Sequence, residues 1–300
     1  MDLLPESATH HSGVGGSPSA HIAMAANPVA PVVALHCSGA GAGLWRRLAE
    51  VLGASRALIA PEHFGCESVG PWTGMHAFTL ADEAARTIAL IDRADGDIHL
   101  VGHSYGGGVA LHVALARPER IASLALYEPS AFHLLRQLGA AGQAPFDEIS
   151  AVVRDTSKDV LEGDFRRAAA RFVDYWGGPG SWNGLRPSAQ DAITRWMPKA
   201  PLDFNALIAE RTPVGAYTAL RVPTLLLRGA HAPRPTRIIA EALATLIPGA
   251  ELSIVAGAGH MGPLTHAAEV NSRLLRHIDT TEPLRVRARL PTANAGTPAQ

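Results

Sequence analysis

The sequence is poor in cysteine, and its charges nearly cancel. Cys37 and Cys66 are its two cysteines, too few for a disulfide framework, which fits a reducing compartment. The net charge of −1 gives no reason to expect nucleic acid or an anionic membrane as a partner. No apolar run approaches the ~18 residues of a membrane span. Residues 1–16 also lack the basic start and apolar stretch of a secretory signal. These absences favour a cytoplasmic protein with no membrane span.

The composition of the remaining chain is that of a globular protein. Hydrophobic residues make up 47% and charged residues 18% of the 300 positions, enough for a large core in one domain or in one domain with an insertion. The two ends differ from the rest. Residues 1–28 are rich in Ser, Gly, Ala, Pro and His, and 280–300 in Pro, Thr, Ala and Arg, both without periodicity. We expect both ends to be disordered.

Between these ends, short apolar runs alternate with helical patterns. The runs predict strands at 32–35, 57–60, 98–103, 121–127, 222–227 and 251–255. Helices are expected between them, among them one over 79–93 with Thr79 as its N-cap and a last one that ends near residue 277. Nearly continuous apolar strands that alternate with helices predict a parallel sheet covered on both faces. The alternation stops between about 128 and 220, where the pattern predicts helices only.

The sequence Gly102-His103-Ser104-Tyr105-Gly106 lies where a predicted strand meets a predicted helix. Strand, sharp turn and helix is the context in which Gly-x-Ser-x-Gly forms a nucleophile elbow, with Ser104 Oγ exposed above the end of the strand. Gly102 and Gly106 would be required where neighbouring chain leaves no room for a Cβ atom. The pentapeptide alone also fits a Gly-rich turn with an incidental serine.

A nucleophilic serine needs a base, and histidine has the pKa for that task near neutrality. His260 follows the last predicted strand in a Gly-rich loop, at the sheet edge where the elbow is expected. We therefore predict His260 as the base, although by itself it would be an ordinary loop histidine. The oxyanion of an acyl intermediate needs preorganised donors. We assign the backbone N–H of Tyr105, after the nucleophile, and of Ser38, in the loop after the first strand.

These motifs together resemble the α/β-hydrolase family. His36-Cys37-Ser38-Gly39 with Trp45 resembles its His-Gly-x-x oxyanion loop, and Ala60-Pro61-Glu62-His63-Phe64-Gly65 is similar to its Ala-Pro-Asp-x-x-Gly segment. The resemblance covers about residues 29–278. It implies a mostly parallel, doubly wound sheet with an all-helical cap inserted after strand 6 of the family's count, here 121–127. Cap aromatics would then line a largely apolar pocket, although most of them also fit an ordinary cap core.

The sequence departs from the family pattern at two positions. Cys37 stands where the family usually has glycine, and we interpret it as a buried bystander. The loop 229–235, where members commonly carry the triad Asp, contains no carboxylate. Some members, including certain haloalkane dehalogenases, take the acid from the end of the preceding strand, where Glu128 lies. We therefore predict Glu128 as the third member of a triad. The alternative is that Glu128 caps a cap helix or pairs with an arginine such as Arg136.

The sequence thus predicts a capped serine hydrolase that acts on an ester-like bond of a small, largely apolar substrate, without cofactor or metal. Carbon–carbon bond hydrolysis of a diketone acid and thioester hydrolysis remain alternatives within the fold. So does a binding protein that has lost the chemistry. The expected division is a disordered arm (1–28), a core (29–130 and 216–279), a cap (131–215) and a disordered tail (280–300). The exact substrate and the oligomeric state stay open.

Overall fold

A six-stranded sheet lies at the centre of the computed structural model, which describes residues 29–289. The strands are arranged in the order β2-β1-β3-β4-β5-β6, and every neighbouring pair is parallel. Their bounds are β1 (Val32–Leu35), β2 (Leu58–Ile59), β3 (Ile98–His103), β4 (Ile121–Tyr127), β5 (Thr224–Gly229) and β6 (Glu251–Val255). The predicted parallel sheet is confirmed, with a strand at each of the six apolar runs.

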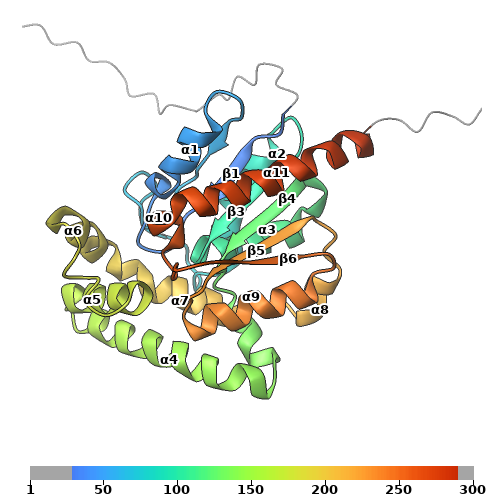
Figure 1. Cartoon of the computed structure of the whole chain (residues 1–300). Coiled ribbons are helices and arrows are strands. Elements are labelled where there is room, and N and C mark those ends of the chain that lie inside the picture. The colour runs from blue at the N-terminus through green and yellow to red at the C-terminus, as the bar shows by residue number, and fades with distance from the viewer. Residues whose placement is uncertain (1–28, 290–300) are drawn as a thin grey trace, which may run out of the picture.

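Helices cover both faces of this sheet (Figure 1). One face carries α1 (Arg46–Leu52) and α11 (Ala267–Arg289), and the other carries α2 (Leu80–Asp92), α3 (Tyr105–Ala116) and α9 (Arg234–Leu246). Short connecting helices are η1 (Ala42–Trp45), η2 (Pro118–Arg120) and α10 (Gly262–Thr265). Successive β1 residues point to opposite faces, Val33 into the core under α2 and α3 and Val32 into the core under α1 and α11. Because both faces are buried, the strands are apolar throughout.

The chain between β4 and β5 is helical, as the sequence predicted. Its elements are η3 (Phe132–Gln137), α4 (Ala140–Leu161), α5 (Phe165–Gly177), α6 (Pro187–Trp196), η4 (Met197–Lys199), α7 (Ala200–Ala209) and α8 (Val214–Thr218). Figure 1 shows α4, α5 and α6 together beyond one end of the sheet, outside the two helical layers. Part of this cap has its own small core, which includes Ala169, Trp182 and Met197. α8 crosses the expected boundary at residue 215 and contacts α9, so we propose that the cap ends before α8.

The last helix is longer than the sequence indicated. α11 runs to Arg289, and it therefore includes residues 280–289 of the tail that the sequence predicted to be disordered. Glu282 explains part of the difference, because its carboxylate accepts hydrogen bonds from Arg56 Nη1 at 3.0 Å and His99 Nε2 at 2.7 Å. Thr281 beside it is buried. A polar composition alone does not reveal such long-range partners. The predicted disorder of 1–28 and 290–300 lies outside the described residues.

Candidate active site

Ser104 stands in a sharp turn between β3 and α3. Its backbone angles are φ 54° and ψ −117°, a left-handed conformation that is strained for a residue with a side chain. The flanking glycines allow the close packing that this turn requires. A Cβ on Gly106 would lie 2.4 Å from the carbonyl oxygen of Leu35, and one on Gly102 would lie 2.6 Å from that of Gly106. The structure therefore has the elbow geometry that the glycine spacing predicted.

His260 reaches Ser104 from the loop after β6. Its Nε2 lies 2.9 Å from Ser104 Oγ, and the imidazole is only 2% exposed. Two buried side chains hold the loop in place: His103 Nε2 donates to the carbonyl oxygen of His260 at 2.8 Å, and the Tyr127 hydroxyl donates to that of Gly259 at 2.7 Å. Burial lowers the pKa of His103 well below its ordinary value, so a neutral ring makes this contact.

Glu128 lies on the other side of the imidazole. Its Oε2 is 2.7 Å from His260 Nδ1, and the residue is fully buried. Loop 229–235, which lacks a carboxylate, contributes a donor instead, because Gly229 N–H donates to Oε1 at 2.9 Å. The Thr236 hydroxyl, from α9, donates to Oε2 at 2.9 Å. The alternative partner, Arg136, lies over the ring of Phe146. The carboxylate of Glu128 therefore holds the imidazole, β5 and α9 in one network.

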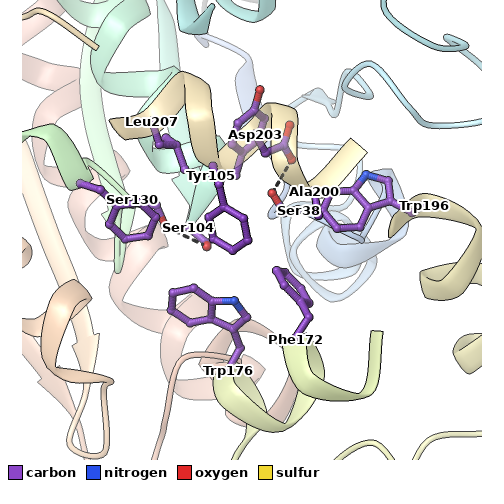
Figure 2. A pocket seen from close by; sticks show the side chains of 12 residues that line it. Ser38, Ser104, Tyr105, Ser130, Phe172, Trp176, Trp196, Ala200, Asp203 and Leu207 are labelled. Atoms are coloured by element: carbon purple, nitrogen blue, oxygen red, sulfur yellow. Dashed lines mark hydrogen bonds between the residues drawn. The ribbon is translucent and has the colours of Figure 1, made fainter. Parts of the chain in front are cut away.

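Ser38 and Tyr105, the expected oxyanion donors, line the same cavity as Ser104 (Figure 2). Tyr105 is the first residue of α3, so its N–H belongs to the turn in which helical amides have no intrahelical acceptor. The loop that carries Ser38 is held by His36, whose Nδ1 donates to the Cys37 carbonyl at 2.8 Å and whose Nε2 accepts from the N–H of His63 at 3.2 Å. Burial lowers the pKa of His36 to about 3. The neutral ring uses its one donor and its one acceptor here.

Cys37 is buried in this loop, and burial raises the pKa of its thiol to about 12. A thiolate does not form there near neutral pH, which agrees with its interpretation as a bystander.

Comparison with known proteins identifies the family of this chain. The family model described as the alpha/beta hydrolase fold matches residues 30–267. The chain belongs to the α/β-hydrolase family. It is 35% identical to a lipase, LipV, from Mycobacterium tuberculosis over 102 residues, which are 34% of this chain and 38% of LipV. The chain thus spans little more than a third of the length of LipV and of a second curated relative.

Two further comparisons span most of the chain. A pimeloyl-[acyl-carrier protein] methyl ester esterase from Aromatoleum aromaticum is 28% identical over 242 residues, 78% of this chain and 92% of the esterase. The crystal structure of a hydrolase from Pseudomonas aeruginosa superposes with a TM-score of 0.65 at 24% identity and covers 83% of this chain and 90% of that one. This structural likeness shows a shared fold.

This α/β-hydrolase has a small cavity of about 10 Å³ over Ser104, between the end of the sheet and the cap (Figure 2). Its apolar lining is formed by Phe132, Phe172, Trp176, Trp196, Ala200, Phe204 and Leu207, and its polar lining by Ser38, Ser104, Tyr105, Ser130 and Asp203. Five aromatic residues of the cap thus line the cavity: Phe132, Phe172, Trp176, Trp196 and Phe204. Trp182 belongs to the cap's own core. Some cap aromatics therefore line a pocket and others pack in an ordinary cap core, so each of the two expectations applies to part of the cap aromatics.

No pattern in the sequence predicted the buried charged cluster that lies beside this cavity. Lys199 forms ion pairs with Asp203 and, at 3.2 Å, with Glu83. Burial raises the pKa of Glu83, but the hydrogen bond and charge of His63 and the charge of Lys199 outweigh it and bring that pKa down to about 2. Asp203 also accepts a hydrogen bond from Ser38 Oγ at 2.5 Å. Cap helix α7 is therefore tied to the loop of Ser38.

Three other polar residues at this site were missed. Ser130, Thr236 and Asp203 each contact a predicted site residue. Only Ser130 had a signal in the sequence, because it follows Glu128 by two positions.

Two absences concern the described part of the chain. Within residues 29–289, no group of three or more His, Cys, Asp or Glu side chains is arranged to hold a metal ion. None of the helices in that range has the length and apolar character needed to cross a membrane.

Proposed function

We propose that this α/β-hydrolase is a serine hydrolase that cleaves an ester-like bond through an acyl-enzyme. The observation that carries the proposal is the buried chain of contacts from Glu128 through His260 to Ser104, at 2.7 and 2.9 Å. Nucleophile, base and orienting acid within hydrogen-bond reach are what acyl transfer requires. The lipase and ester esterase among the relatives agree with this class of reaction.

The proposed mechanism begins with the proton of Ser104. An ionised Glu128 only accepts, so it keeps the proton of His260 on Nδ1 and leaves Nε2 free to accept from Ser104 Oγ. Ser104 attacks the carbonyl carbon, and the N–H groups of Ser38 and Tyr105 stabilise the oxyanion. His260 then passes its proton to the leaving alcohol. In the second half, water gives a proton to His260 and attacks the acyl-enzyme, and Ser104 Oγ recovers its proton as it leaves.

The cavity favours a small, largely apolar substrate. Most of its lining is aromatic or aliphatic, and linings of this kind are typical of sites for small apolar molecules. The carboxylate of Asp203 faces this cavity (Figure 2), whereas Lys199 is not part of the lining. A diketone acid would bring a second carboxylate to the same space, so carbon–carbon hydrolysis is the less favoured alternative. A serine at the elbow also disfavours dehalogenase or epoxide hydrolase chemistry, which needs a carboxylate nucleophile.

A fluorophosphonate probe tests the proposal directly. Wild-type protein is expected to be labelled on Ser104 and to hydrolyse short p-nitrophenyl esters faster than long ones. The Ser104→Ala variant is the control and should do neither. Failure of wild-type protein to be labelled, with no ester hydrolysed, would favour the non-catalytic binding protein.

A further inference from the structure

Ser104 Oγ has a second buried partner besides His260. Ser130 Oγ lies 3.1 Å from it, and Figure 2 shows this contact inside the cavity. Ser130 is 2% exposed, and the mechanism described above does not use its hydroxyl.

The backbone holds Ser130 in this position. Its N–H donates to the carbonyl oxygen of Ser104 at 3.0 Å. The preceding residue, Pro129, packs so closely on α3 that a Cβ on Gly107 would lie 2.8 Å from its Cα. One short segment after β4 thus carries Glu128 on one side of the site and Ser130 on the other. Both are placed against the elbow by the same strand end.

The direction of the hydrogen bond follows from the chain of partners. A Glu128 carboxylate can only accept, which puts the proton of a neutral His260 on Nδ1. His260 Nε2 is then an acceptor, so Ser104 spends its single proton on His260. Ser104 Oγ therefore accepts in its contact with Ser130, and the Ser130 hydroxyl is the donor.

We propose that Ser130 is a further catalytic residue, whose hydroxyl stabilises negative charge on Ser104 Oγ. This inference rests on the proposed serine hydrolase function. As Ser104 loses its proton to His260 and forms the bond to the carbonyl carbon, charge grows on Oγ where Ser130 donates. When water has attacked the acyl-enzyme, the bond from carbon to Oγ breaks and the same donor stabilises the leaving oxygen. Ser130 keeps its own proton throughout.

The test compares the rates at which the fluorophosphonate labels Ser130→Ala and wild-type protein. Ser130→Ala loses one hydrogen bond to a charged group, so its labelling rate and its kcat for a p-nitrophenyl ester are expected to be about 10–100-fold lower than those of wild type. Its KM should be nearly unchanged. Ser130→Cys keeps the shape but has a weak donor, so its rates are expected between those of Ser130→Ala and wild type. Ser123→Ala is the matched control, because it removes a buried hydroxyl of β4 that bonds His99 at 2.8 Å instead of Ser104.

The pH profile of kcat/KM separates a chemical role from a structural one. The described residues show no hydrogen bond between Ser130 and His260, so the midpoint that reports the base should be the same in Ser130→Ala and wild type. A slower variant with a shifted midpoint would indicate a displaced base and overturn the inference. The inference is also overturned if folded Ser130→Ala is labelled at a rate within about twofold of the wild-type rate. If the alanine variant does not fold, labelling of Ser130→Cys at the wild-type rate overturns it. If the probe labels wild-type protein in these experiments, the proposed serine hydrolase function is retained and only the role of Ser130 is lost. If the probe does not label wild-type protein, the proposed function and the role of Ser130 are both overturned.

Discussion

The Glu128 carboxylate meets His260 Nδ1 at 2.7 Å, although it leaves the sheet from β4 beside the elbow strand and not from the loop after β5. Glu128 itself has φ 43°, an uncommon conformation for a residue with a side chain. Gly229 and Thr236 then hold the carboxylate from the far side. The loop that lacks an acid thus orients one supplied by the neighbouring strand.

Glu128→Gln is expected to fold and to lose most turnover. An amide in place of the carboxylate favours the wrong tautomer of His260 and no longer stabilises the imidazolium, a defect of up to ~10⁴ in kcat. Thr236→Val should cost less, because it removes one of the three donors to the carboxylate. Steady-state hydrolysis of a p-nitrophenyl ester measures both variants. An active glutamine variant would exclude Glu128 as the acid.

Ser104 and His260 are expected to act as a unit. Neither group helps without the other, so Ser104→Ala, His260→Ala and the double variant should show nearly the same residual rate. The measurement is turnover of one ester by all three variants. Losses that multiply would show that the two residues act independently.

The oxyanion assignment distinguishes the amide of Ser38 from its hydroxyl. Ser38→Pro removes the N–H, and loss of one such donor typically costs ~10²–10³ in kcat. Ser38→Ala keeps the amide but removes the hydrogen bond to Asp203, so we expect a small rate loss and a free energy of unfolding lower by about 1 kcal/mol. Circular dichroism must show that the proline variant folds. Full turnover by that folded variant would refute the assignment.

The end of α11 is expected to contribute to stability and not to catalysis. A chain that stops at Asp279 loses Glu282, whose carboxylate accepts hydrogen bonds from the buried side chains of Arg56 and His99. An unsatisfied buried group costs about 1–3 kcal/mol, which should lower the melting temperature by several degrees. A chain that stops at Arg289 is the control and should melt like the full protein. Equal melting temperatures for the two would show that Glu282 contributes nothing.

The lowered pKa of Glu83 predicts that the free energy of unfolding decreases at acid pH. Its pKa falls from the ordinary 4.5 to about 2 on folding, so its contribution is fully present above pH 4.5. That contribution is lost as the pH falls through 4.5 toward 2. Urea unfolding of Glu83→Gln should therefore vary less with pH in this window than unfolding of wild type. The exposed Glu50→Gln is the control, and an unchanged slope for Glu83→Gln would contradict the prediction.

Local patterns in the sequence determined the frame of the site. Apolar runs with helices between them predicted every strand of the sheet, because a strand buried on both faces has to be apolar along its whole length. Glycines at 102 and 106 predicted the elbow, because only glycine lets the chain pass so closely. Glu128 came less directly, from a missing acid at 229–235 together with the family resemblance.

Tertiary structure alone decided which side chains complete that frame. Asp203 reaches Ser38 from 165 residues away in sequence, and Glu282 reaches Arg56 across 226 residues. Thr236 meets Glu128 in the same way, across 108 residues. A hydrogen bond depends on distance and direction in space, and no periodicity or local spacing encodes either for residues so far apart. Ser130 lies only 26 residues from Ser104 in sequence. Its role as donor nevertheless follows from the contacts that link Glu128, His260 and Ser104. Those contacts exist only because the sheet brings the ends of three strands to one edge.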